Sequence, residues 1–184
     1  SNRIFVKHVL LDDPFVQILQ NGTKFNFSDL VSSDSTEIKA DTIPSPPTKY
    51  IINDIRIARG YVKYTDLQLS HTIALNKLDL VIPGFTWNSD STDLSVDFRF
   101  VDGGGLLSKL SINQADSTYS LNLIIDSLNL AIIEPYVKSS MQVSSLRGFM
   151  SNDLRINGSI SSILKMLIRG VNHIYDFQLT DTLN

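Results

Sequence analysis

Residues 94–100 alternate strictly between apolar and polar side chains, and this alternation limits the possible folds more than any other feature. Leu94, Val96, Phe98 and Phe100 are each separated by a single polar residue. Successive side chains of a β-strand point to opposite faces, whereas a helix repeats every 3.6 residues. The segment is therefore predicted to be a strand with one apolar face and one polar face.

The same one-faced pattern recurs along most of the chain after residue 50. Turn-rich segments at 88–92, 102–105 and 113–118 separate the predicted strands, and such short connections favour hairpins. The apolar positions change parity between Ile125 and Leu128, which predicts a bulge or a strand break there. The recurring apolar sets are Ile55 and Ile57, Val62 and Tyr64, Leu78, Leu80 and Ile82, Leu110 and Ile112, Leu121, Leu123 and Ile125, and Leu154 and Ile156.

Composition agrees with a β-rich chain. Among 184 residues there are 23 Leu, 20 Ile and 11 Val, but only 5 Ala and 2 Glu. Strong helix formers for exposed positions are therefore scarce, whereas β-branched residues are plentiful. We predict a mainly β fold in which an antiparallel meander forms a curved sheet or half-barrel, with one or two short helices.

Three regions are expected. Residues 1–31 should form a strand pair and a short helical turn that complete the sheet, with a hairpin turn at Asn21-Gly22 and Asn26 or Ser28 as the helix N-cap. Residues 32–48 contain three prolines and are expected to form a mobile loop. Residues 49–184 should form the antiparallel β region, with a short helix near 135–141.

The segment near the carboxyl end admits two interpretations. Its apolar residues have helical spacing, and Gly170 is a possible end signal for a helix, so the pattern favours a helix. A strand is also compatible with the pattern. The residues concerned are Ile160, Ile163, Leu164, Leu167 and Val171.

Several function classes find no support in the sequence. The net charge is −3, which argues against a nucleic-acid surface, and there is no cysteine for a disulfide, a zinc site or a thiol nucleophile. His8, His71 and His173 lie far apart in the sequence and lack metal-ligand spacing. Asp102–Gly105 is better explained as a hairpin tip than as a phosphate-binding loop, because no Lys-Ser/Thr follows it. We therefore expect no metal, no cofactor and no enzymatic activity.

The apolar strand face must be covered by something, and two interpretations remain open. Another part of the sheet could cover it, which would close a sandwich or half-barrel core. Alternatively, the face could remain a partly open groove that holds the hydrocarbon of a ligand. The candidate groove or core face consists of Leu78, Leu80, Ile82, Leu94, Val96, Phe98, Phe100, Leu121, Leu123 and Ile125.

A short Asp-Ser/Thr motif followed by an apolar residue or Thr occurs more often than composition alone predicts. It resembles the O-glycosylation acceptor motif of exported proteins in Bacteroides-type bacteria. Turn chemistry also enriches these dipeptides and is a competing explanation. The candidate acceptors are Ser35, Thr42, Ser91, Ser117, Ser127 and Thr182.

The order of the segments resembles the AsmA-like family. Residues 3–18 and 26–30 are similar to the family's unit of a strand, a Leu-x-x-Pro-x-Val-x-Ile run and an Asn-hydrophobic-x-Asp-Leu turn. Ile51–Asp66 resembles the following strand pair, Leu121–Val137 the strand that leads into a short Pro-Tyr helix, and Gly148–Gly158 the strand after it.

This resemblance implies a fragment of a longer, periplasmic protein of Gram-negative bacteria, anchored to the inner membrane by a segment outside these residues. It implies a role in outer-membrane biogenesis or phospholipid transport, with acyl chains and envelope proteins as partners and no catalytic residue. The alternative is a structural β-sandwich module of a cell-envelope protein that binds glycan or protein through loops near Trp87 or residues 32–48.

Overall fold

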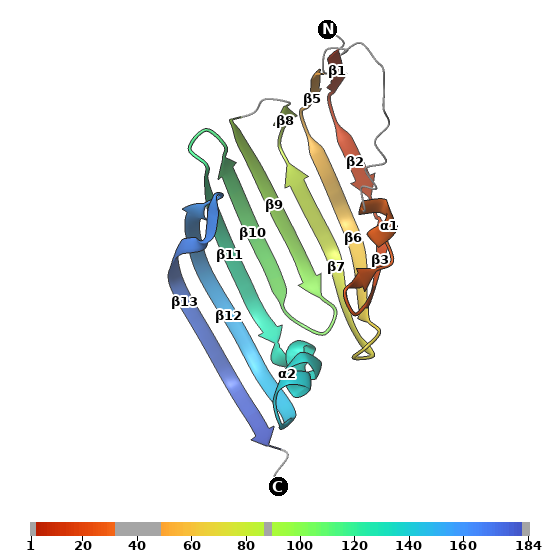
Figure 1. The fold of residues 1–184 in the computed structure, drawn as a ribbon, viewed down its shortest axis with the longest axis vertical. Helices are drawn as coiled ribbons and strands as arrows, with labels where there is room; N and C mark the ends of the chain where they lie inside the picture. Colours follow the sequence, from red (N-terminus) through yellow and green to blue (C-terminus); the bar gives the residue numbers. More distant parts are fainter. Residues whose placement is uncertain (1–2, 32–48, 87–89, 182–184) are drawn as a thin grey trace.

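The computed structural model describes residues 3–31, 49–86 and 90–181. The fold is mainly β, as predicted, and forms a curved sheet with short helices (Figure 1). The strands are β1 (Arg3–Val6), β2 (Val9–Asp12), β3 (Phe15–Asn21), β4 (Lys24–Phe25), β5 (Lys49–Ile52), β6 (Ile55–Asp66), β7 (His71–Ile82), β8 (Phe85–Thr86), β9 (Ser91–Phe100), β10 (Gly105–Asn113), β11 (Thr118–Asn129), β12 (Val143–Ser159) and β13 (Ser162–Asp181). The helices are α1 (Ser28–Val31), the 3-10 helix η1 (Leu130–Ile133) and α2 (Glu134–Ser140).

The main sheet has ten strands. Their order is β13-β12-β11-β10-β9-β7-β6-β3-β4, and β2 also pairs with β6. From β6 to β13 neighbouring strands are antiparallel, as the short connections predict. β2 and β3, however, pair with β6 in parallel, and β1 pairs with β5 in parallel. The sheet is therefore mixed at its amino-terminal side and an antiparallel meander elsewhere.

A small sheet of order β1-β5-β8 continues three strands of the main sheet beyond a break. β1 leads into β2, β5 into β6, and β7 into β8. Asp54 lies at the break between β5 and β6, where its carboxylate accepts hydrogen bonds from Arg56 Nε at 3.0 Å and from His8 Nδ1 at 2.7 Å. The hydrogen bond from Arg56, with a smaller contribution from His8, lowers the pKa of Asp54.

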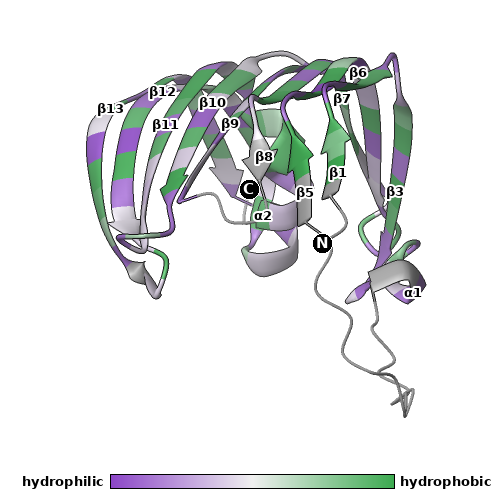
Figure 2. Ribbon diagram, turned by 90° about the horizontal axis from the view of Figure 1, so that it is seen from above, coloured by the Kyte–Doolittle hydropathy of each residue, from purple (hydrophilic) through white to green (hydrophobic). Residues whose placement is uncertain are grey.

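The main sheet curves into an arch that stays open along one side (Figure 2). β13 lies at one end of the arch and β3 at the other, and α2 lies within its concave side. In the described residues β13 pairs with none of β2, β3 and β4, so the sheet is an open arch and not a closed barrel.

Three local predictions can be compared with the structure. The register shifts between Ile125 and Leu128, as the parity change predicts. The helix expected near 135–141 is α2, which begins at Glu134 with Pro135 in its first turn. The helical interpretation of residues 160–171 is wrong, because Ser162–Asp181 is a strand paired with β12. Residues 32–48, predicted to form a loop, lie outside the described residues.

Few apolar side chains are sealed from solvent in the described part of the chain. The buried apolar residues are Leu130 and Ile132 of η1 and Val143 and Leu146 of β12. They lie where η1 and α2 pack against the beginning of β12. The compact core is therefore small and local, and within residues 3–31, 49–86 and 90–181 no second layer of comparable size covers the rest of the sheet.

Candidate functional site: the apolar concave face

The ten predicted face residues come together on one side of the main sheet. In one row across the strands, Leu80 pairs with Val96, Val96 with Ser108, and Ser108 with Leu123. Residues directly opposite one another in neighbouring strands project to the same face. Two further rows lie on either side of this one and cross β9 to β13. One consists of Leu94, Leu110, Leu121, Ile156 and Ile168. The other consists of Phe98, Leu106, Ile125, Asn152 and Asn172.

This apolar face, defined as the ten predicted residues, is the concave side of the arch. Leu75 pairs with Phe100, and His71 lies on the same face of β7 as Leu75 because their positions differ by an even number. The carbonyl oxygen of Ile132 in η1 accepts a hydrogen bond from His71 Nε2 at 2.8 Å. η1 and α2 therefore pack on the apolar face, and Figure 2 places α2 inside the arch.

All ten residues of the apolar face are only partly buried. The neighbouring polar positions on the other side, such as Asp97, Arg99 and Asn122, are exposed. Curvature and neighbouring strands shield the apolar side chains in part, but no second sheet packs on them in the described residues. The face consequently retains apolar surface that can contact a hydrocarbon ligand, because burying such surface is favourable.

η1 and α2 connect the two walls of the arch near one end. They follow β11, yet reach β7 through the His71–Ile132 hydrogen bond and an edge-on contact between the rings of His71 and Tyr136, with centroids 5.7 Å apart. Burial, and then a hydrogen bond with Tyr64, raises the pKa of Tyr136 above its ordinary range. Tyr64 also donates to Gln20 Oε1 at 2.6 Å, so this polar cluster extends to β3.

Glu134 fixes the start of α2 to β12. Its Oε2 accepts a hydrogen bond from the backbone N–H of Leu146 at 2.8 Å, and Oε1 accepts one from Lys138 Nζ. The hydrogen bond from Leu146, followed by that from Lys138, lowers the pKa of Glu134. A carboxylate with a lowered pKa stabilises the fold while it is ionised.

The variant Glu134→Gln tests this connection. At neutral pH we expect it to be less stable than the wild-type chain, because the amide cannot replace the charge-assisted hydrogen bonds. The folded-state pKa is lowered, so the contribution of Glu134 is complete above its unfolded pKa and disappears as pH falls through the folded pKa. Urea denaturation from pH 7 to pH 3 should show the gap between the two proteins closing. A gap that is constant with pH would contradict this role.

Several apolar residues of the concave side were not among the ten residues predicted from the sequence. Val9 and Leu11 of β2 pair with Ile55 and Ile57, and Val16 of β3 pairs with Val62, so the apolar surface continues to the amino-terminal edge. Their alternation is visible in the sequence, but it does not reveal that β2 and β3 pair in parallel with β6, whose paired residues lie 46 positions further along the chain. The surface is also interrupted, because Asn152 lies opposite Ile125.

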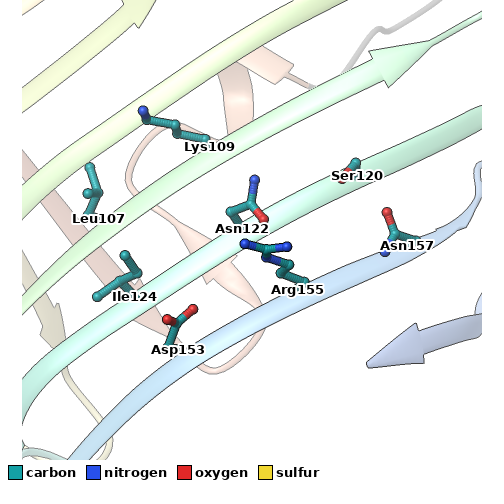
Figure 3. A pocket seen from close by; sticks show the side chains of 8 residues that line it. All are labelled: Leu107, Lys109, Ser120, Asn122, Ile124, Asp153, Arg155 and Asn157. Carbon is teal, nitrogen blue, oxygen red and sulfur yellow. The ribbon is translucent and has the colours of Figure 1, made fainter. Parts of the chain in front are cut away.

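The opposite, convex side of the sheet is mainly polar. It carries a shallow pocket of about 590 Å³ across β10, β11 and β12 (Figure 3). The lining residues are Leu107, Lys109, Ser120, Asn122, Ile124, Asp153, Arg155 and Asn157. No charged residue of this lining is buried, so the pocket has the character of a solvated sheet face.

The predicted glycosylation positions differ in solvent exposure and in hydrogen bonding. Ser117 is exposed in the turn between β10 and β11, and Ser91 is exposed at the start of β9. The Ser127 hydroxyl donates to Asp126 Oδ1 and accepts from Tyr175, so its hydrogen bonds stabilise the bulge in β11. Ser35, Thr42 and Thr182 lie outside the described residues, as does Trp87.

The described residues contain no group of three or more His, Asp or Glu side chains that could hold a metal ion. The three histidines have separate surroundings: His8 contacts Asp54, His71 contacts η1, and the ring of His173 lies 5.1 Å from that of Tyr175. In the same part of the chain, no helix has the length and apolar character needed to cross a membrane.

No family model, curated protein or solved structure matches this chain.

Proposed function

We propose that this chain is a non-enzymatic section of an AsmA-like periplasmic protein and that its concave apolar face holds phospholipid acyl chains. The protein would act in outer-membrane assembly or in phospholipid transport between membranes. The observation that carries the proposal is the set of ten partly exposed apolar side chains on the concave side of an open arch. The order of the sequence motifs, which resembles the AsmA-like family, supports the same assignment.

The physical basis is the transfer of hydrocarbon out of water. Each methylene group of an acyl chain that leaves water contributes about 0.8 kcal/mol. The row from Leu94 to Ile168 places one apolar side chain on each of five consecutive strands, β9 to β13. An acyl chain could lie across such a surface while its polar headgroup stays at the open side of the arch.

The sandwich alternative requires a closed core between two sheets. Among the described residues the ten-stranded sheet instead faces no sheet of similar size, and the small sheet continues β2, β6 and β7. Only four apolar side chains of the described residues are buried. No observation on the convex side favours a glycan or protein ligand over solvent, so the lipid proposal is preferred.

Photo-crosslinking on the two sides of β9 tests the proposal. Benzoylphenylalanine is introduced at Phe98 on the apolar face or at Arg99, the exposed neighbour on the opposite face. Each protein is illuminated with vesicles of phosphatidylethanolamine and phosphatidylglycerol and analysed by mass spectrometry. We expect a phospholipid adduct at position 98 at a level at least about tenfold above that at position 99. No adduct at either position, or equal yields, would rule out lipid contact on the apolar face.

A further inference from the structure

The two short helices η1 and α2 bridge the concave side of the arch at one end of the strands. On the first wall, Glu134 Oε2 of α2 accepts a hydrogen bond from the N–H of Leu146 in β12 at 2.8 Å. On the second wall, His71 Nε2 of β7 donates to the carbonyl oxygen of Ile132 at 2.8 Å. β11, β10 and β9 lie between these two walls in the strand order. This bridge, residues 130–140, therefore crosses the concave side, where Figure 2 shows α2.

The bridge lies beyond the last apolar residue of β9. Phe100 ends β9 and pairs with Leu75 of β7, and His71 lies further along β7 in the same direction. Asn129, directly before η1, donates from Nδ2 to the carbonyl of Asp102 in the turn that follows β9, at 3.3 Å. A hydrocarbon chain that lies along β9 on the concave side therefore meets the bridge at the Phe100 end.

Unbroken series of apolar side chains run along the strands on the concave side. In β9 every concave position from Leu94 to Phe100 is apolar, and in β11 the same holds from Leu121 to Ile125. Two of the three rows that cross the strands are instead interrupted, one by Ser108 and one by Asn152. A hydrocarbon chain consequently keeps more apolar contact along the strands than across them.

The polar side chains at the bridge end are engaged within the protein. Asp66 pairs with His71 in the sheet and is 8% exposed, and its Oδ1 accepts hydrogen bonds from the N–H groups of Gln68 and Leu69 at 2.9 and 3.1 Å. The Tyr64 hydroxyl donates to Gln20 at 2.6 Å. A phosphate group placed here would face the carboxylate of Asp66, and like charges repel strongly where water is excluded. This end is therefore unfavourable for a phospholipid headgroup.

The other end of the same strands is polar and exposed. The turn between β10 and β11, residues 114–117, is exposed throughout, and Ser91 at the start of β9 is also exposed. The N–H of Gln114 donates to the carbonyl of Asp90 at 2.7 Å, so this turn lies beside the start of β9. A headgroup at this end can stay in water at the open side of the arch.

The apolar series of β9 also has the length of a long acyl chain. Leu94 and Phe100 are separated by about 20 Å, because a strand advances about 3.4 Å per residue. An extended hydrocarbon advances about 1.3 Å per carbon, because its bonds of about 1.5 Å zigzag, so a chain of about sixteen carbons spans the series.

We propose that phospholipid acyl chains of about this length lie along the strands, with their methyl ends against the bridge and the headgroup beside the β10–β11 turn. The proposal rests on the lipid binding proposed above and adds to it a direction and a chain length. The bridge then acts as the stop that fixes how far an acyl chain enters.

Brominated lipids test the direction, because bromine quenches the fluorescence of an indole that it contacts. Trp87→Phe first removes the single native tryptophan. Phe100→Trp then places an indole next to the bridge, and Leu94→Trp places one toward the β10–β11 turn. Each protein is incubated with vesicles of phosphatidylethanolamine that is brominated near either the methyl end or the carbonyl end of its acyl chains. Gel filtration separates the protein from the vesicles before fluorescence and bound lipid are measured.

Phe100→Trp should be quenched at least about twofold more by the methyl-end label, and Leu94→Trp by the carbonyl-end label, because the two positions are about 20 Å apart. If Phe100→Trp does not fold, Leu75→Trp reports the same end, since Leu75 lies opposite Phe100. Asp97→Trp on the convex side is the control and should be quenched little by either label. Bound lipid with equal quenching by both labels, or with the opposite order, would overturn the direction alone. Protein that emerges without lipid would overturn the lipid binding itself, and the direction with it.

Discussion

The variant Gly104→Ala is expected to lose about 3 kcal/mol of unfolding free energy, which lowers the Tm by roughly 10 °C in a chain of this size. Gly104 has a φ of 97°, and an added Cβ would lie 2.7 Å from the Cα of Leu128 and 2.8 Å from the carbonyl oxygen of Ser127. Both neighbours are backbone atoms and cannot move aside as a flexible side chain would. Thermal denaturation followed by circular dichroism measures the effect.

The loss of stability in Gly104→Ala is expected to be large because the turn between β9 and β10 contacts the segment that leads into η1. The turn between β9 and β10 packs against the bulge in β11, and Asn129 Nδ2 donates to the carbonyl of Asp102 at 3.3 Å. η1 begins immediately after Asn129, so displacing the turn also displaces the segment that carries two of the buried apolar residues. The matched control is Gly84→Ala, where the nearest atom to an added Cβ is the Asn53 carbonyl oxygen at 3.8 Å. Its stability should change by less than about 0.5 kcal/mol, and equal losses in both variants would refute the argument.

The sequence predicts the strands of the meander because their two faces have different surroundings. Leu94, Val96, Phe98 and Phe100 share one face and polar residues share the other, so a period of two is visible without any knowledge of neighbours. The bulge at Ile125–Leu128 is visible for the same reason, since the extra residues shift the parity.

The helical interpretation of residues 160–171, which stood beside a strand alternative, is wrong for a related physical reason. β13 carries apolar side chains on both faces, for example Leu167 and Ile168, so its period of two is lost and the remaining spacing imitates a helix. Pairing with β12 decides the conformation, and pairing is a non-local interaction. Likewise, the apolar pattern of β2 and β3 does not specify strand direction, and their parallel pairing with β6 could not be read from it.

The composition of the candidate site was predictable, but its boundary was not. All ten face residues belong to regular alternating strands. In contrast, the contact of η1 with His71 joins residues 61 positions apart through a backbone carbonyl, which leaves no residue-type signal. The cluster around Tyr136 and Tyr64 therefore emerges only from the curvature of the sheet.

The variant Leu123→Asp is expected to reduce the phospholipid bound to the chain at least about tenfold, because a carboxylate in the middle of the apolar face must lose hydration when an acyl chain covers it. Leu123 pairs with Ser108 on one side and Leu154 on the other, near the centre of the sheet. The measurement is the amount of lipid per protein after incubation with vesicles of phosphatidylethanolamine and phosphatidylglycerol, determined by mass spectrometry.

The neighbouring residue supplies a matched control. Ile124 lies on the same strand, projects to the convex side and is 42% exposed. Ile124→Asp introduces the same charge at almost the same place, so its lipid content should stay within about twofold of the wild-type value, since no acyl chain lies on that side. If Leu123→Asp lowers the Tm, Ser108→Asp gives an independent test, because it adds the charge to the concave side without removing an apolar side chain. Equal lipid loss from charges on both faces, or no loss from Ser108→Asp in a folded protein, would show that the concave side does not carry lipid.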